Sequence, residues 1–226
     1  MNSICIIPAR SGSVRIKNKN IIKFQNKPII YWSIQAAKKS KCFKKIYVST
    51  DSDRIAKIVK KFGKIDIIKR PKKFSNNKAP LIDVIHHALM SVKISYDAVC
   101  CILPASPLIM FNDIALSKKF LSKNCNFVVP VTHYDYPIQK SIFFKKKNFI
   151  DLTKKKLANK RSQDFKEKYH DVGQFYWGKK NYFLKYKNIF TSRKVKGFFI
   201  PNYRTRDIDT KEDIKISQQI FKIYKK

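Results

Sequence analysis

Short apolar runs alternate with amphipathic segments along the first two-thirds of the chain. The apolar runs have the length of strands and cover residues 3–7, 45–49, 65–68, 97–103 and 126–131. The segments between them have helical spacing of apolar residues or helix-starting residues, and cover 28–40, 52–62, 80–92 and 112–122. Strands that alternate with helices build a mostly parallel sheet through right-handed crossovers. The sequence therefore predicts an α/β fold, a Rossmann-like, doubly wound, mostly parallel sheet.

The alternation stops after Thr132 and resumes at Val172. Residues 134–170 are basic and irregular, with a hairpin pattern at 141–144 and 148–151. We interpret them as an insertion into a single domain that covers residues 1–226. Apolar runs at 172–177 and 198–200 and a final helix from Thr210 complete the pattern. Because ligands of such sheets bind at the carboxyl ends of the strands, the loops after the strands should carry the site.

The net charge is the extreme feature of the composition. The chain of 226 residues has 50 Lys+Arg against 15 Asp+Glu, a formal charge of +35. Dense positive charge attracts nucleic acids and anionic membranes. However, most of these cations are Lys spread along the chain, whereas proteins that read DNA grooves favour the bidentate guanidinium of Arg. The 44% hydrophobic content excludes a disordered basic tail. We interpret the Lys excess as solvated surface and expect no nucleic-acid partner.

The cysteines and the apolar runs bear on localisation. The five cysteines form no Cys-x-x-Cys pair, which favours free thiols in a reducing compartment over a disulfide framework or a zinc site. No apolar run approaches the ~18 residues of a membrane-spanning helix. The N-terminus lacks the basic region of a signal peptide. We expect a cytoplasmic protein without a membrane partner.

The loop after the first predicted strand combines cations, hydroxyls and a glycine. Several amides and cations in one loop suit a triphosphate, although the Gly-x-x-x-x-Gly-Lys-Ser/Thr pattern of a P-loop is absent. A solvated basic loop is the alternative in so Lys-rich a chain. The position after the strand and the use of two scarce Arg favour a functional loop. The candidates are Arg10, Ser11, Gly12, Ser13, Arg15 and Lys19.

Acidic residues are scarce, yet Asp207, Asp209, Glu212 and Asp213 lie within seven residues. Asp207 and Asp209 alternate at strand spacing, so both carboxylates can point the same way. Carboxylates together with phosphate oxygens suit Mg²⁺. Glu212 and Asp213 are better explained by a helix that starts at Thr210, because acids are favoured in a first helical turn.

A third stretch, residues 161–178, sets polar groups among aromatic residues, as in a small-molecule pocket. His170 and Asp171 are adjacent, so on a strand their side chains diverge. We therefore interpret His170 as a structural or hydrogen-bonding residue and not as half of an acid/base pair.

These motifs occur together in one known family. The chain resembles the CMP-sugar synthetases, the acylneuraminate cytidylyltransferases, over nearly its whole length. The resemblance depends on Ile7-Pro8-Ala9-Arg10, Ser13, Arg15, Lys19-Asn20, Val48-Ser49-Thr50-Asp51 and Asp207-Ile208-Asp209-Thr210. Four further stretches look most like the pseudaminic acid branch: Cys100-Cys101-Ile102 before Pro104-Ala105-Ser106-Pro107, Tyr136-Pro137-Ile138-Gln139, Arg161-Ser162-Gln163-Asp164, and Tyr169 to Gly178.

The resemblance implies a fold of the nucleotidyltransferase type with an inserted dimerisation segment. It implies that a nine-carbon 2-keto sugar acid attacks the α-phosphate of CTP, giving a CMP-sugar and pyrophosphate. It also implies a Mg²⁺ cofactor and a homodimer. The sequence singles out no general base.

The resemblance also assigns roles by matching position. The implied nucleotide-binding residues are Arg10, Ser11, Gly12, Ser13, Arg15, Lys19, Asn20, Arg70 and Ser106. The implied sugar-side residues are Arg161, Gln163, Gln174 and Tyr176, and the implied metal ligands are Asp207 and Asp209. The implied catalytic residues are Arg10, Arg15, Lys19 and Asp209.

Two positions depart from the family pattern. Val14 stands where the pseudaminic branch has a phosphate-neutralising Lys, and Arg15 takes that role, as in the similar synthetases for the eight-carbon acid KDO. Ile109 stands where sialic acid synthetases tend to have Arg. The alternatives are a synthetase for legionaminic or N-acetylneuraminic acid, an inactive homologue, and a nucleic-acid-binding protein.

Overall fold

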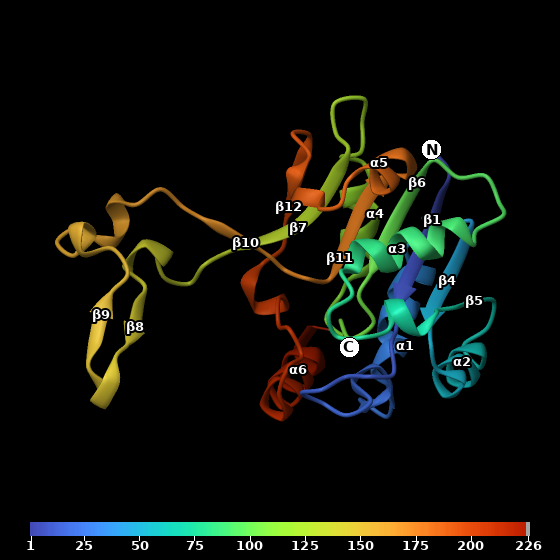
Figure 1. The fold of residues 1–226 in the computed structure, drawn as a ribbon, viewed down its shortest axis with the longest axis horizontal. Helices are drawn as coiled ribbons and strands as arrows, with labels where there is room; N and C mark the ends of the chain where they lie inside the picture. Colours follow the sequence, from blue (N-terminus) through green and yellow to red (C-terminus); the bar gives the residue numbers. More distant parts are fainter. Residues whose placement is uncertain (225–226) are drawn as a thin grey trace.

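The computed structural model describes residues 1–224, with Lys147 described by its backbone alone. Its centre is one eight-stranded sheet of order β10-β7-β11-β6-β1-β4-β5, in which β12 also pairs with β7 (Figure 1). The strands of this sheet are β1 (Ser3–Pro8), β4 (Lys45–Thr50), β5 (Asp66–Lys69), β6 (Ala98–Ile102), β7 (Phe127–His133), β10 (Tyr169–Asp171), β11 (Phe175–Lys179) and β12 (Val195–Phe199).

The sheet is mostly parallel, as the alternation predicts. Strand β1 pairs in parallel with β4 and β6, and β4 pairs in parallel with β5. Strand β12 is parallel to β7, whereas β11 runs antiparallel to both β6 and β7. From β1 the chain moves outward to β4 and β5, then crosses to β6 on the other side of β1. The strand order therefore reverses between β1 and β6, which is where sheets of this class bind ligands.

Helices cover both faces of the sheet. They are α1 (Ile29–Lys39), α2 (Asp53–Lys60), α3 (Leu81–Met90), α4 (Phe111–Lys118), α5 (Lys180–Lys185) and α6 (Lys211–Tyr224). On β1, Cys5 and Ile7 pack into one buried cluster with α1, α2 and α4, while Ile4 and Ile6 pack into another with α3 and α5. This alternation follows from the two-residue period of a strand and makes β1 the buried centre of a three-layer fold.

Most predicted elements are present with shifted ends, and local contacts explain where the helices start. Ser52 Oγ accepts a hydrogen bond from the Ile55 amide and caps α2. Pro28 and Pro80 precede α1 and α3 as their N-caps. The expected loop after the first strand holds the short 3-10 helix η1 (Lys19–Ile21) and a two-stranded ladder of β2 (Lys23–Phe24) and β3 (Lys27–Pro28).

The insertion leaves the sheet between β7 and β10 as an arm, defined here as residues 134–168 (Figure 1). It contains the expected hairpin, with β8 (Ile142–Phe144) paired antiparallel to β9 (Ile150–Leu152). Large apolar side chains of the arm are exposed, including Tyr136, Phe144 and Phe149. The arm therefore adds exposed apolar surface outside the buried core of the sheet.

Two features of the fold differ from the expected pattern. The strands β10 and β11 meet at Gly173, which has a φ of 66°, so the predicted run 172–177 is bent and its strand begins at Phe175. The short helix α5 was not expected. Within the described residues, no helix is long and apolar enough to cross a membrane.

Candidate active site

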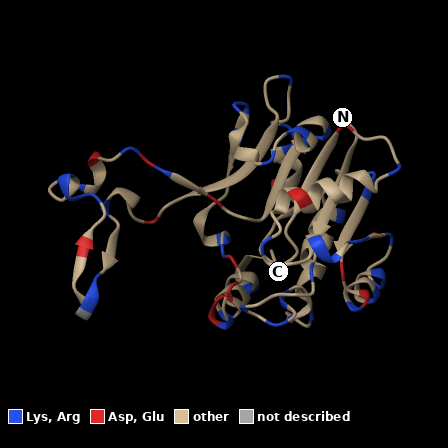
Figure 2. Cartoon of the chain, viewed as in Figure 1, with Lys and Arg blue, Asp and Glu red and all other residues tan. Residues whose placement is uncertain are grey.

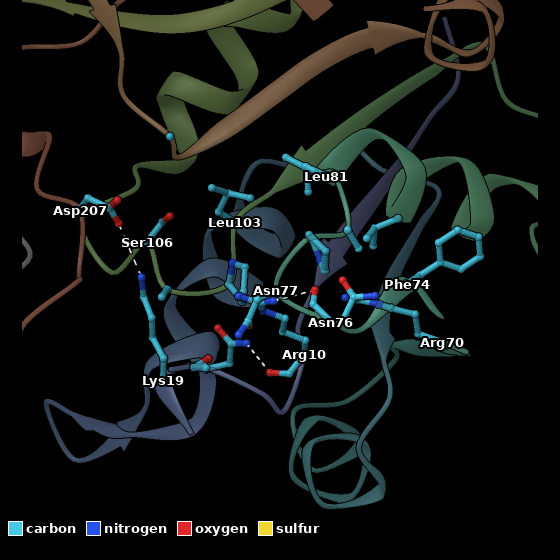
Figure 3. A pocket seen from close by; sticks show the side chains of 18 residues that line it. Arg10, Lys19, Arg70, Phe74, Asn76, Asn77, Leu81, Leu103, Ser106 and Asp207 are labelled. Atoms are coloured by element: carbon cyan, nitrogen blue, oxygen red, sulfur yellow. Dashed lines mark hydrogen bonds and ion pairs between the residues drawn. The ribbon is translucent and has the colours of Figure 1, made fainter. Parts of the chain in front are cut away.

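A pocket of about 260 Å³ opens at the carboxyl ends of β1 and β6 (Figure 3). Its walls are the loop after β1, Arg70 after β5, the start of α3, the loop after β6, Gly173 and Asp207. The pocket therefore lies at the reversal of strand order, and it brings together residues from both ends of the chain.

The loop after β1 is held by hydrogen bonds on both sides. Ser11 donates its amide to Asp51 Oδ1 at 2.9 Å and its hydroxyl to Asp51 Oδ2 at 2.6 Å. The buried Asn20 donates its side-chain amide to the Arg10 carbonyl at 2.8 Å, and Arg10 Nη1 donates to the Asn76 carbonyl at 2.9 Å. These bonds fix the backbone of the loop while leaving most donors of the Arg10 guanidinium unused.

The middle of the same loop is open. A Cβ atom on Gly12 would meet no atom within 4 Å, so packing does not require glycine there. Ser13 lines the pocket. The Val14 side chain is 75% exposed. The loop thus presents free space and small side chains beside the cations.

Cations and carboxylates meet at the mouth of the pocket. Arg15 Nη1 lies 2.5 Å from Asp209 Oδ2, and Lys19 Nζ lies 3.1 Å from Asp209 Oδ1. Lys19 Nζ also lies 3.7 Å from Asp207 Oδ1 (Figure 3). The prediction that both carboxylates face the same way agrees with these contacts, but residues 205–209 form no strand. Instead the fully buried Ile208 between them points inward, which turns its two neighbours outward.

The carboxylates of Asp207, which lines the pocket, and of Asp209, which shares Lys19 with it, are candidate ligands of Mg²⁺. Among the described residues, no group of three or more His, Cys, Asp or Glu could hold a metal ion. A metal here would therefore need oxygens from a substrate. Mg²⁺ characteristically combines one or two protein carboxylates with substrate phosphates and water, so the donor set fits.

Arg70 forms the buried wall of the pocket. Its Nε donates to Ser49 Oγ at 3.1 Å and its Nη2 to the Ser49 carbonyl at 2.6 Å. Burial lowers the pKa of Arg70 to about 10, so the group keeps its charge at neutral pH. Ser106, also buried, lines the same pocket, and Ser33 Oγ holds the loop before it by donating to the Leu103 carbonyl at 2.8 Å.

Comparison with known proteins decides the family. The cytidylyltransferase family matches residues 4–222. The chain belongs to the cytidylyltransferase family. It is 34% identical to a pseudaminic acid cytidylyltransferase of Campylobacter jejuni over 99% of this chain and 97% of that protein. It is 30% identical to an N-acylneuraminate cytidylyltransferase of Escherichia coli over 95% of this chain and 51% of that protein.

The fold agrees with solved structures. A CMP:2-keto-3-deoxy-manno-octonic acid synthetase complexed with CTP superposes with a TM-score of 0.73 and covers 99% of both chains at 15% identity. This likeness shows the shared fold, a mostly parallel sheet of the nucleotidyltransferase type. The family match and the full-length relative show that the chain is a nucleotidyltransferase, and the predicted resemblance to cytidylyltransferases is confirmed.

In this cytidylyltransferase the expected sugar-side residues divide into two groups. Gln174 and Tyr176 form the first group: they follow Gly173, which lines the pocket, but neither is itself a lining residue. Tyr176 Oη donates to Asp171 Oδ2 at 2.6 Å, and burial together with that carboxylate raises the pKa of Tyr176. Gln174 is buried and donates its Nε2 to the Arg204 carbonyl at 2.7 Å.

Arg161 and Gln163 belong to the second group. Both lie in the arm, which extends away from the central sheet in Figure 1, and neither lines the pocket. Arg161 pairs with Asp164 of the same turn, with Nη2 3.2 Å from Oδ1. One copy of this cytidylyltransferase therefore does not bring Arg161 or Gln163 to its own pocket.

Sequence reasoning assigned no role to several side chains that hold the site. Asp51 anchors the loop after β1, and Asp113 pairs with Arg204. Asp51 could have been singled out as a scarce acid directly after a predicted strand. The Asp113–Arg204 pair joins residues 91 apart in the chain, and no local pattern signals such a contact.

Proposed function

We propose that this cytidylyltransferase activates pseudaminic acid with CTP, giving the CMP-sugar and pyrophosphate. The observation that carries the proposal is the end-to-end similarity to a relative of that name, which covers 99% of this chain and 97% of the relative. A pocket with basic walls suits two anionic substrates, a nucleoside triphosphate and a sugar acid.

The pocket supports a division of the nucleotide between two sides. We assign the triphosphate to the loop after β1 and the base to the buried wall. The free space around Gly12 supports the triphosphate assignment, and the guanidinium of Arg70, held by Ser49, supports the assignment of the base. The proposed nucleotide-binding residues are Arg10, Ser11, Gly12, Ser13, Arg15, Lys19, Asn20, Arg70 and Ser106.

The reaction is a phosphoryl transfer in which the anomeric hydroxyl attacks the α-phosphate and pyrophosphate leaves. Catalysis of such transfers is mostly positioning and neutralisation of charge. Arg15 and Lys19, which pair with Asp209 in the free enzyme, would turn to phosphate oxygens. Mg²⁺ held by Asp207 and Asp209 would supply further neutralisation and lower the pKa of the attacking hydroxyl. Arg10 completes the set of cations on the phosphates.

A homodimer formed through the arm is part of the proposal. Tyr136 is 84% exposed and Phe144 76%, although both are large and apolar. Burial of such surface favours association at about 25 cal/mol per Å². In a dimer, Arg161 and Gln163 could reach a sugar acid in the pocket of the second copy, since they do not line the pocket of their own copy. A guanidinium matches a carboxylate bidentately.

We place the reaction in the cytoplasm. The described cysteines are all free, and Cys5, Cys100 and Cys101 are buried thiols. Burial raises the pKa of the Cys101 thiol to about 12, which keeps it protonated and unreactive. Free thiols of this kind suit a reducing compartment.

Pyrophosphate release tests the proposed function. The purified chain is incubated with CTP, Mg²⁺ and one acid at a time: pseudaminic, legionaminic, N-acetylneuraminic or KDO. We expect kcat/KM to be highest with pseudaminic acid, and release to need both CTP and the sugar acid. UTP in place of CTP and a reaction without sugar serve as blanks. A higher kcat/KM with another acid would refute the assignment of the sugar, and no release with any acid would refute the activity.

A further inference from the structure

The two acidic residues of the site lie on a stretch without strand partners. Between β12 and α6 the chain contains the short 3-10 helix η8 (Asn202–Arg204), and residues 205–209 have no regular structure. A site that positions phosphates needs its ligands held to within about 0.5 Å. Within the described residues, Asp207 and Asp209 make no backbone hydrogen bond of a ladder or a helix, so side-chain contacts must hold them.

A buried ion pair fastens this stretch at its start. Arg204 Nη1 lies 2.5 Å from Asp113 Oδ2 and Nη2 lies 3.4 Å from Oδ1. The two side chains are only 16% and 10% exposed. The surface pair of Lys69 and Asp53, by contrast, has side chains that are 85% and 79% exposed. A two-pronged Arg–carboxylate contact fixes direction as well as distance.

The backbone of Arg204 is held as well. Gln174 Nε2 donates to the Arg204 carbonyl at 2.7 Å, and Gln174 is itself 3% exposed. Thr205 Oγ1 donates to the Asn202 carbonyl at 2.7 Å and closes the turn of η8. Arg204 is therefore clamped between the first turn of α4, which carries Asp113, and the bend that precedes β11.

The other end of the stretch is anchored in the core. Ile208 is fully buried in a cluster with Phe24, Leu108 and Phe221. Two residues later Thr210 exchanges hydrogen bonds with Asp213 at the start of α6. Asp207 thus lies three residues after the fixed Arg204 and one residue before the buried Ile208. Asp209 lies between Ile208 and the cap of α6 at Thr210.

We propose that Asp113 and Arg204 are positioning residues, which hold residues 204–209 so that the carboxylates of Asp207 and Asp209 face Lys19 beside the pocket. The pair itself does not touch the substrates. This inference rests on the proposed function, because it concerns how the same site presents its carboxylates to CTP and Mg²⁺. It also requires that a substitution of Asp113 on α4 alters how the site binds the phosphates of CTP.

Hydrogen exchange of the ligand-free enzyme tests the positioning directly. Asp113→Asn keeps the shape of the side chain and removes its charge, and Arg204→Lys keeps the charge and removes the fork. Both variants should exchange the hydrogen-bonded amides of residues 205–209, those of Thr205, Ile208 and Asp209, about tenfold faster than the wild type, while β1 and β6 are unchanged. Asp66→Asn, which breaks the Lys45–Asp66 pair at the start of β5, is the matched control and should leave these amides alone.

Binding and kinetics then separate positioning from general stability. We expect both variants to raise the Kd for CTP measured with Mg²⁺, and the KM for CTP, by about tenfold. The KM for the sugar acid should change less than about twofold, because Arg161, the residue proposed for its carboxylate, lies in the arm, and the Arg204 carbonyl that binds Gln174 is kept in both variants. Val59→Ala, a core change on α2, lowers stability without this split and controls for loss of stability.

Three outcomes decide between the alternatives. Faster exchange at residues 205–209 together with the CTP-specific loss supports the proposal. A lower melting temperature with unchanged exchange there, or equal losses for both substrates, would refute it and leave the pair a purely structural contact. If Asp113→Asn fails to fold, Arg204→Lys carries the same test. The exchange measurement needs no turnover. An enzyme inactive with CTP would therefore refute the proposed function, while the exchange rates would still decide whether Asp113 and Arg204 hold residues 205–209.

Discussion

At the scale of residues, the site converges on the ammonium group of Lys19. Its Nζ lies within reach of Asp207 and Asp209, and Asp209 also pairs with Arg15. The Arg15 side chain is 71% exposed, so its pair adds only about 0–1 kcal/mol to stability. In the free enzyme these charges neutralise one another at little energetic gain, which leaves them free to exchange partners when phosphates arrive.

Replacement of Asp209 by Ala should abolish turnover and leave the fold intact. The change removes a carboxylate that both Arg15 and Lys19 contact. We expect kcat to fall by about 100-fold or more, measured by pyrophosphate release, with an unchanged circular dichroism spectrum. Asp53→Ala, at an exposed pair on α2, is the control. Near wild-type turnover of Asp209→Ala with Mg²⁺ would contradict the assignment of Asp209 as a metal ligand.

Replacement of Val14 by Lys should be tolerated and should strengthen CTP binding. The Val14 side chain is 75% exposed, so no packing is lost. A cation added to the phosphate loop should lower the KM for CTP by about two- to fivefold at low salt. The gain should shrink as ionic strength rises, because salt screens exposed charges. Loss of activity would mean that the loop does not lie along the triphosphate.

The site residues that a sequence can reveal are those carried by local motifs. Arg10, Lys19 and Asp209 stand out by type and position and come together in the structure. Arg204 and Asp113 do not, because their contact depends on how α4 and η8 pack, and neither residue belongs to a local pattern.

At the scale of elements, helix α6 illustrates how local chemistry defines an end. Thr210 Oγ1 donates to Asp213 Oδ2 at 2.8 Å and accepts from the Asp213 amide at 3.1 Å. This is the capping arrangement that the spacing of Thr210 and Asp213 predicts. The cap orients the first turn of the helix that follows directly after Asp209.

Loss of this cap should have a pH-dependent cost. Burial pushes the pKa of Asp213 upward, but hydrogen bonds from Thr210 and from the Asp209 amide outweigh it and lower the pKa below its ordinary 3.8. The stabilisation is therefore present above that value and is lost as pH falls through the folded-state pKa. Thr210→Ala should cost about 1 kcal/mol at pH 7 and less at pH 3, measured by urea unfolding. An equal cost at both pH values would contradict the assigned cap.

The sequence predicts whether an element is a helix or a strand wherever the apolar pattern is long enough. It does not predict the direction in which a strand runs in the sheet. The run that became β11 is equally apolar whichever way the strand points, so its antiparallel pairing with β6 follows only from the arm and the bend at Gly173. Helix α5 has six residues, fewer than two turns, and its pattern is too short to recognise.

At the scale of the whole molecule, the positive charge has two different explanations. Figure 2 shows Lys and Arg distributed over helices, loops and the arm rather than gathered at the site alone. Arg10, Lys19 and Arg70 line the pocket proposed for two anionic substrates, and Arg15 pairs with Asp209, which also contacts Lys19. The remaining Lys residues agree with solvated surface. The assignment of residues 1–226 to a single domain stays a prediction.

Charged substitutions on the arm should dissociate the proposed dimer. Phe144 and Phe149 are 76% and 68% exposed. The double variant Phe144→Asp, Phe149→Asp should sediment as a monomer under conditions where the wild type is a dimer, because charge at a buried apolar interface is unpaired. Phe190→Asp, at a site 59% exposed outside the arm, should remain dimeric. A monomeric wild type, or a dimer that survives the double substitution, would contradict the role of the arm.

The most direct measurement is the mass and ³¹P NMR spectrum of the product formed from CTP and pseudaminic acid. We predict one phosphodiester that joins CMP to the sugar, together with an equal amount of free pyrophosphate, and neither in the Asp209→Ala blank. Unchanged CTP and pseudaminic acid after incubation with Mg²⁺, or a CMP-sugar formed only from a different acid, would contradict the proposed function.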